Sequence, residues 1–119
     1  MDTKTKKNLV RRPWGNYRIL FQESGVWVKR VEVNPKSRLS LQKHRKRSEK
    51  WIVVSGKGLT VVNNRKIIVE PGCVVDIPLG AIHRIGNTGN KASLVFIEVA
   101  CGSYLGEDDI IRLEDDYNR

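Results

Sequence analysis

The chain has 119 residues, the length of one domain, and its 22 Lys and Arg against 13 Asp and Glu leave a net charge of +9. No apolar run approaches the ~20 residues of a membrane helix, so we expect no membrane partner. The N-terminus lacks the apolar core of a secretory signal, and two isolated cysteines do not form a disulfide framework. We therefore expect a cytoplasmic protein with reduced thiols.

The positive charge is unevenly distributed along the chain. Residues 1–50 carry 15 Lys or Arg against 4 Asp or Glu, whereas residues 107–119 carry 6 acidic groups against 2 basic ones. Zinc-finger spacing, RNP-like aromatic strands and basic heptad helices are all missing. The sequence therefore predicts no nucleic-acid partner, and the basic excess favours a small anionic ligand.

The chain begins with a Lys- and Arg-rich stretch that has little to bury. We expect a flexible basic arm over residues 1–12 and a folded domain over residues 13–119. Apolar and alternating segments then recur at short intervals, separated by Gly, Pro and Asn. The predicted strands are residues 17–21, 26–33, 51–54, 59–62, 66–69, 73–77 and 93–99, with a bulge in the second of these.

Two further segments complete the prediction. Asn63-Asn64-Arg65 between two β-like runs indicates a hairpin, and residues 107–117 are the only candidate helix, a weak one because Asp is a poor helix former. Many short strands with turns every ~8–12 residues predict an all-β sandwich or barrel. Trp14, Trp27 and Trp51 are expected as core anchors, with sugar stacking as the alternative.

A split set of polar residues carries the chemistry of this sequence. Gln42 and His44 are two apart and so share one face of an extended strand. Glu49 follows a basic turn-like run, and His83 follows a turn at Pro78 and Gly80. Two imidazoles, a carboxylate and an amide oxygen can surround one divalent cation. A single histidine is more often a packed or surface side chain than a metal ligand. The metal-site hypothesis therefore rests on all four polar residues together.

These segments resemble the two motifs of the cupins, the second one in Pro78-x-Gly80-x-x-His83-x-x-x-Asn87. Within the cupins, the chain from residue 11 onward resembles the type II phosphomannose isomerases, in which this domain is usually fused to a mannose-1-phosphate guanylyltransferase. The resemblance rests on residues 12–15 (RPWG), 39–51 (LSLQKHRKRSEKW) and 102–117 (GSYLGEDDIIRLEDDY). It implies a cupin, that is, a double-stranded β-helix or jelly-roll barrel, here with a short C-terminal helix and as a stand-alone domain.

The resemblance also implies an activity and a cofactor. It predicts a metal-dependent isomerase that interconverts mannose 6-phosphate and fructose 6-phosphate through a cis-enediol, and a homodimer. The implied metal ligands are Gln42, His44, Glu49 and His83. Zinc is the expected ion, and manganese, cobalt, iron or nickel would also suit this set. The chain departs from the family at Arg45, Lys46 and Lys50, where further histidines are common, and at Ser37, where a motif glycine is expected.

Three residues are the predicted catalytic groups, each with an alternative. Arg112 can stabilise enediolate charge or hold a phosphate, and otherwise pairs with an acidic neighbour on a helix face. Arg47 resembles a basic residue near the substrate, and otherwise is one more solvated charge. Glu98 is the candidate base, because burial inside a barrel would raise its pKa, and otherwise is a surface acid at the end of a strand.

Two other functions remain open from the sequence. One is an isomerase or epimerase of another phosphorylated sugar. The other is a non-catalytic sugar-phosphate-binding cupin that partners a separate nucleotidyltransferase. Loss of turnover in His44→Ala separates an enzyme from a binding module, which has no turnover to lose.

Overall fold

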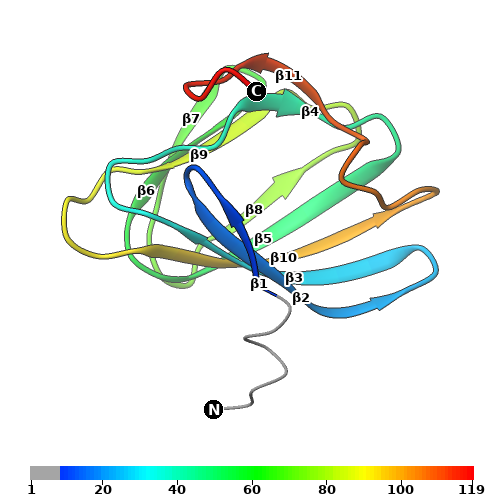
Figure 1. Cartoon of the computed structure of the whole chain (residues 1–119), viewed down its shortest axis with the longest axis horizontal. Helices are drawn as coiled ribbons and strands as arrows, with labels where there is room; N and C mark the ends of the chain where they lie inside the picture. Colours follow the sequence, from blue (N-terminus) through cyan, green and yellow to red (C-terminus); the bar gives the residue numbers. More distant parts are fainter. Residues whose placement is uncertain (1–8) are drawn as a thin grey trace.

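The computed structural model describes residues 9–119 as two antiparallel sheets that face each other (Figure 1). The six-stranded sheet has the order β1 (Leu9–Arg12), β2 (Gly15–Glu23), β3 (Val26–Val33), β10 (Leu94–Gly102), β5 (Arg47–Ser55) and β8 (Val74–Ile77). The five-stranded sheet has the order β11 (Ile111–Glu114), β4 (Leu41–Lys43), β9 (His83–Asn87), β6 (Gly58–Val62) and β7 (Arg65–Val69).

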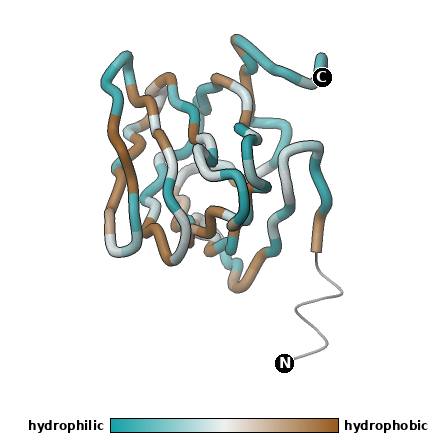
Figure 2. Tube along the Cα trace, turned by 90° about the vertical axis from the view of Figure 1, so that its left-hand side faces the viewer, coloured by the Kyte–Doolittle hydropathy of each residue, from teal (hydrophilic) through white to brown (hydrophobic). Residues whose placement is uncertain are grey.

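From β3 onward the chain crosses repeatedly between the two sheets. Strand β4 follows β3 on the opposite sheet, β5 returns, and the β6–β7 hairpin, β8, β9, β10 and β11 continue the exchange. This winding is the double-stranded β-helix that the resemblance implied. Figure 2 shows the same chain path turned by a quarter, with hydrophilic and hydrophobic positions alternating along the trace.

The core lies between the two sheets, where alternate residues of each strand point inward. Trp51 and Phe96 stack in it, with ring centroids 4.8 Å apart, and Trp14, Ile85 and Leu94 are also buried. The hairpin prediction is confirmed: Asn63 and Asn64 have positive φ angles of 46° and 68°, as a two-residue type I′ turn requires between β6 and β7.

Three sequence predictions are wrong in detail. Residues 107–117 contain no helix, because Ile111–Glu114 pairs with β4 as strand β11. The bulge expected in residues 26–33 lies in the partner strand β2, between Ile19 and Phe21. Leu9–Arg12, assigned to the flexible arm, forms β1 against β2, and the rest of that arm lies outside the described residues. Across residues 9–119 there is no helix with the length and apolar character needed to cross a membrane.

Candidate metal centre and active site

A cavity of about 120 Å³ lies between the two sheets and collects most of the predicted site residues. Its walls include Gln42, His44, Glu49 and His83, together with all three predicted catalytic residues, Arg47, Glu98 and Arg112. Strand register explains this convergence. Gln42 lies directly opposite His83 on the five-stranded sheet, and Glu49 lies opposite Ala100 on the other. Each of these rows turns its side chains toward the cavity.

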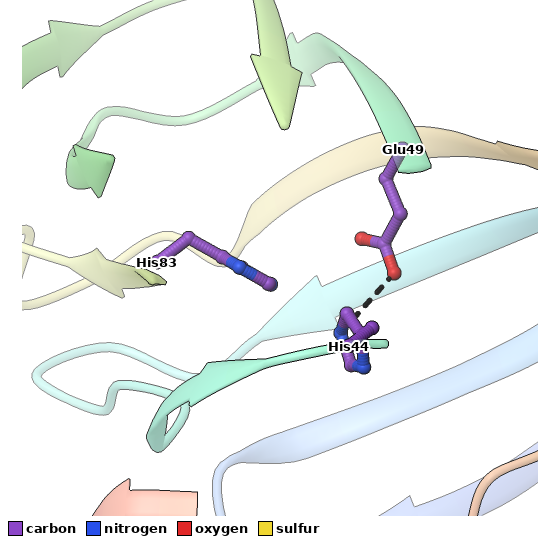
Figure 3. Close-up of side chains that lie close together, drawn as sticks. All are labelled: His44, Glu49 and His83. Atoms are coloured by element: carbon purple, nitrogen blue, oxygen red, sulfur yellow. Dashed lines mark ion pairs between the residues drawn. The ribbon is translucent and has the colours of Figure 1, made fainter. Parts of the chain in front are cut away.

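Three of the predicted ligands, which all line this cavity, lie close together (Figure 3). Ligand atoms of His44, Glu49 and His83 all lie within 4.8 Å of one another, and His44 Nε2 is 3.4 Å from Glu49 Oε2. The three residues are only 3 %, 3 % and 2 % exposed. Such a buried cluster of imidazole and carboxylate groups has the chemistry of a divalent cation site.

Hydrogen bonds set the tautomer of both histidines. His44 Nδ1 lies 2.6 Å from the carbonyl oxygen of Asp109, and His83 Nδ1 lies 2.9 Å from that of Ala81. Because a carbonyl only accepts, each Nδ1 carries the proton and each Nε2 carries a lone pair that can bind a cation. The lone pair of His44 Nε2 also faces Arg47 Nη2, which lies 3.3 Å away and can donate to it. Burial lowers the pKa of both imidazoles, although the Glu49 carboxylate opposes this shift, so both rings are biased toward the neutral form that binds metal.

Gln42 presents its amide in the same way. Its Nε2 donates to the hydroxyl and the carbonyl oxygen of Ser40, at 3.1 and 3.3 Å. These bonds leave the amide oxygen of Gln42 without a partner among the described residues and available as a fourth donor atom. All four predicted ligands therefore face one cavity.

The Glu49 carboxylate is held by two donors. Arg47 Nε donates to its Oε2 and Trp51 Nε1 donates to its Oε1, each at 2.9 Å. Burial would raise the pKa of Glu49, but the nearby His44 and Arg47 lower it overall, so the group stays ionised. Arg47 is buried and also donates to the Gly106 carbonyl oxygen at 3.0 Å. The alternative of a solvated Arg47 is therefore wrong.

Glu98 is buried on β10, so the alternative of a surface acid at a strand end is also wrong. Trp27 Nε1 donates to its Oε2 at 2.7 Å. Burial raises the pKa of Glu98 and the Glu49 carboxylate raises it further, while Lys29 and Arg47 partly oppose the shift. This carboxyl group therefore holds a proton far more tightly than a carboxyl group in water.

Arg112 lies in β11 directly opposite Gln42 and lines the cavity from its exposed edge. The helix-face pairing with Asp109 or Glu114 does not exist, because no helix forms there and no ion pair joins these residues. Lys50, in contrast to Arg112, faces away from the cavity, and its Nζ lies 3.6 Å from Asp76 Oδ1. The three tryptophans are buried, as expected of core anchors.

Sequence reasoning missed Lys29, a buried lysine in the cavity wall. Its Nζ lies 3.8 Å from the Trp27 ring centroid, 4.2 Å from that of Tyr17, and 2.5 Å from Glu107 Oε2. The available signal was the alternation of Trp27, Lys29, Val31 and Val33, which all point inward. The bulge predicted in residues 26–33 would have broken this alternation, whereas β3 keeps it without a break.

The sequence also did not indicate that the segment between β10 and β11 contacts the site. It supplies carbonyl partners to His44 and Arg47, and the Asp109 carboxylate accepts the backbone N–H groups of Arg45 and Lys46, each at 3.0 Å. In Figure 1 this segment runs from the end of β10 to β11, beside β4. It therefore forms part of the wall of the site.

Comparison with known proteins identifies relatives of similar sequence. The chain is 46% identical over 110 residues to the alginate biosynthesis protein AlgA of Pseudomonas aeruginosa, and equally to the xanthan biosynthesis protein XanB of Xanthomonas campestris pv. campestris. It is 45% identical over 105 residues to a mannose-1-phosphate guanylyltransferase of Sinorhizobium fredii. These matches cover 92%, 92% and 88% of this chain but only 23%, 23% and 20% of the relatives.

Solved structures establish the fold independently. The capsular polysaccharide assembling protein CapF of Staphylococcus aureus superposes with a TM-score of 0.77 at 23% identity, over 89% of this chain and 34% of that one. A cupin-2 domain of Rhodospirillum rubrum superposes with a TM-score of 0.66 at 21% identity, over 79% of this chain and 67% of that one. The fold is therefore a cupin.

The described fold and the four cavity-facing donors fit one protein family. Its model, described as "Mannose-6-phosphate isomerase C-terminal", matches residues 1–115. The chain belongs to the mannose-6-phosphate isomerase C-terminal family.

Proposed function

We propose that this protein is a metal-dependent mannose-6-phosphate isomerase that interconverts mannose 6-phosphate and fructose 6-phosphate through a cis-enediol. The observation that carries the proposal is the convergence of His44, Glu49 and His83 beside the proton-holding Glu98 in one cavity. Family membership supports the same reaction class. The chain spans about a quarter of the length of the curated relatives that it matches. The proposal that this domain carries the isomerase activity therefore rests on the residues of its own cavity.

The donor set fits a divalent cation, with zinc as the expected ion and manganese, cobalt, iron or nickel as substitutes. The two Nε2 atoms, the Glu49 carboxylate and the Gln42 amide oxygen would hold it. When bound, the cation would supply Lewis acidity at the sugar oxygens on C1 and C2.

The chain itself would move the proton. In its ionised form, Glu98 would take the proton from C2 of the aldose and return it to C1, and the overall reaction also moves the hydroxyl proton of O2 to O1. Its raised pKa suits this exchange, because a base works best when its pKa lies near the working pH. Trp27 would orient the carboxyl group through its 2.7 Å hydrogen bond. Arg47 would keep Glu49 in place and adds positive charge beside the developing enediolate.

A coupled assay tests the proposal. Purified protein is given mannose 6-phosphate, and fructose 6-phosphate is measured before and after chelation and after zinc, manganese or cobalt is restored. We expect metal-restorable turnover that His44→Ala abolishes and Lys43→Ala leaves unchanged, because Lys43 faces away from the cavity. No turnover with any metal, in folded and metal-loaded protein, would transfer the function to another sugar phosphate or to a binding role.

The predicted homodimer and cytoplasmic location belong to the same proposal, as does the phosphorylated hexose as its ligand. Light scattering of the purified chain measures the oligomeric state directly. A monomer that retains full turnover would show that one chain completes the site.

A further inference from the structure

Six cationic side chains line the cavity, and four of them already have strong partners. Lys29 pairs with Glu107, Arg47 with Glu49, Arg84 with the carbonyl oxygens of Leu39 and Glu114, and Arg119 with Asp115. Arg12 and Arg112 are different. Within residues 9–119 neither has a carboxylate partner, and the described bonds of Arg12 go to the Arg11 carbonyl and the Tyr17 hydroxyl.

The two unpaired guanidinium groups lie close to a third. Arg12, Arg112 and Arg119 line the same cavity. Burial lowers the pKa of Arg112, the positive charges of Arg119 and Arg12 lower it further, and the Asp115 carboxylate opposes this shift. One carboxylate, Asp115, faces three guanidinium groups, so a positive excess remains. A phosphate monoester with about −1.5 to −2 charges at pH 7 would offset this excess. Arg12 comes from β1 and Arg112 from β11, so the fold brings them together from opposite ends of the described chain.

Strand register places this cluster relative to the metal ligands. Arg112 is opposite Gln42, and Gln42 is opposite His83, so the three form one row across β11, β4 and β9. Two strand spacings separate Arg112 from His83, which is about 10 Å between backbones. A hexose 6-phosphate carries its phosphate at the end opposite to C1 and C2. A sugar with C1 and C2 beside His83 can therefore reach Arg112 with its phosphate.

The neighbouring contacts hold the cluster in place. Asp115 accepts from both the side chain and the backbone N–H of Arg119, at 2.9 and 3.0 Å. Arg12 donates to the Tyr17 hydroxyl at 3.5 Å, and its guanidinium lies 5.4 Å from the Tyr17 ring centroid. Guanidinium groups oriented in this way can bind phosphate oxygens in bidentate fashion.

We propose that Arg12, Arg112 and Arg119 form the phosphate-binding subsite of the cavity, with Arg12 and Arg112 as its main contacts. The inference rests on the proposed function, since it assumes a phosphorylated hexose as the ligand. It assigns Arg112 to substrate binding and removes it from the proton-transfer chemistry.

Inorganic phosphate provides a test that does not depend on turnover. Calorimetric titration of the full chain should detect phosphate binding, and Arg12→Gln and Arg112→Gln should each weaken it about ten- to a hundred-fold. Arg65→Gln is the matched control, because it removes the same charge from the exposed β7 hairpin. Unchanged affinity in both cavity variants, or an equal loss in the control, would overturn the subsite.

Kinetics separates this inference from the proposed function. With mannose 6-phosphate, Arg112→Gln should raise KM about ten- to a hundred-fold with little change in kcat. A fall in kcat with unchanged KM would overturn the assignment. If no variant or wild-type protein isomerises the sugar but phosphate binding still requires Arg12 and Arg112, the isomerase proposal fails and the subsite stands.

Discussion

At the scale of single residues, the cavity holds two buried glutamates with opposite protonation. Glu49 is surrounded by Arg47, Trp51 and His44 and stays ionised, whereas Glu98 lies among fewer positive groups and beside Glu49, so its pKa rises. When two carboxyl groups lie in different environments, their pKa values differ. The group with the higher pKa can then act as an acid–base catalyst, while the group with the lower pKa stays charged and can act as a ligand. The roles proposed for Glu98 and Glu49 correspond to this division.

Glu98→Gln tests the role of this proton. Glutamine keeps the size of the side chain and still accepts the Trp27 hydrogen bond, but it cannot transfer a proton. We expect kcat to fall about 10²- to 10⁴-fold with unchanged metal content, measured by the isomerase assay and by metal analysis. Full activity in this variant would exclude Glu98 as the base.

The same substitution has a pH signature in stability. Because the folded-state pKa of Glu98 is raised, its contribution is complete below the ordinary glutamate pKa of about 4.3 and is lost as the pH rises through the raised folded value. Wild type should therefore lose stability relative to Glu98→Gln on going from acid to alkaline pH. Urea unfolding of both proteins across that range measures the difference, and parallel curves would contradict it.

At the scale of elements, the segment between β10 and β11 connects the active-site wall to the basic turn before β5. Asp109 makes this connection through the backbone amides of Arg45 and Lys46. Burial alone would raise its pKa, but these two N–H donors lower it overall. The stabilisation from this connection is therefore complete above the ordinary aspartate pKa of about 3.9 and is lost as the pH falls through the lowered value.

Asp109→Ala should loosen this segment without unfolding the barrel. We expect faster amide exchange over residues 103–114 and unchanged exchange in β10, measured by hydrogen–deuterium exchange. Asp108→Ala is the matched control, because the Asp108 carboxylate bonds only the Tyr104 hydroxyl, at 2.6 Å, within the described contacts. Equal exchange rates in the two variants would show that Asp109 is not the anchor.

The β6–β7 hairpin provides a second test at this scale. Asn64 has a φ of 68°, a conformation that costs most residues about 1–2 kcal/mol. Asn64→Ala should therefore lower the free energy of unfolding by about 1 kcal/mol, and Asn64→Gly should not. Urea denaturation compares them, and an equal loss in both variants would indicate a side-chain contact as the cause.

At the scale of the whole molecule, the proposed metal ligands come from both sheets. Glu49 belongs to the six-stranded sheet, and Gln42 and His83 belong to the five-stranded one. A cation that binds only the folded arrangement stabilises it by mass action, by about 2.7 kcal/mol at a hundred times its Kd. The bound metal would thus act as a cross-link between the layers.

Chelation should therefore lower the Tm of the wild-type protein, and His83→Ala should remove this response. Lys43→Ala, whose side chain lies outside the cavity, should keep it. Thermal unfolding with and without chelator measures the difference, alongside metal analysis. An unchanged Tm after complete metal removal would show that the cation does not contribute to holding the sheets together.

The sequence by itself determined the local features of this protein. The alternation of apolar and polar residues predicted most strands, and Asn63-Asn64 predicted the hairpin turn. The two-residue spacing of Gln42 and His44 predicted that both side chains face the same side. These patterns are readable because they depend on neighbours within a few positions along the chain. The resemblance then identified the sandwich or barrel as a cupin and the polar set as the metal ligands of a known family.

Only the tertiary structure decided which distant segments pair. Strand β11 forms because β4 offers it a hydrogen-bonding edge, and this pairing overrides the helix expected over residues 107–117. The burial of Lys29 depends on Glu107 and two aromatic rings, and the cluster of Arg12 with Arg112 depends on strands from opposite ends of the described chain. Such contacts leave no periodic trace in the sequence, because the partners of a strand are set by the folding of the whole chain.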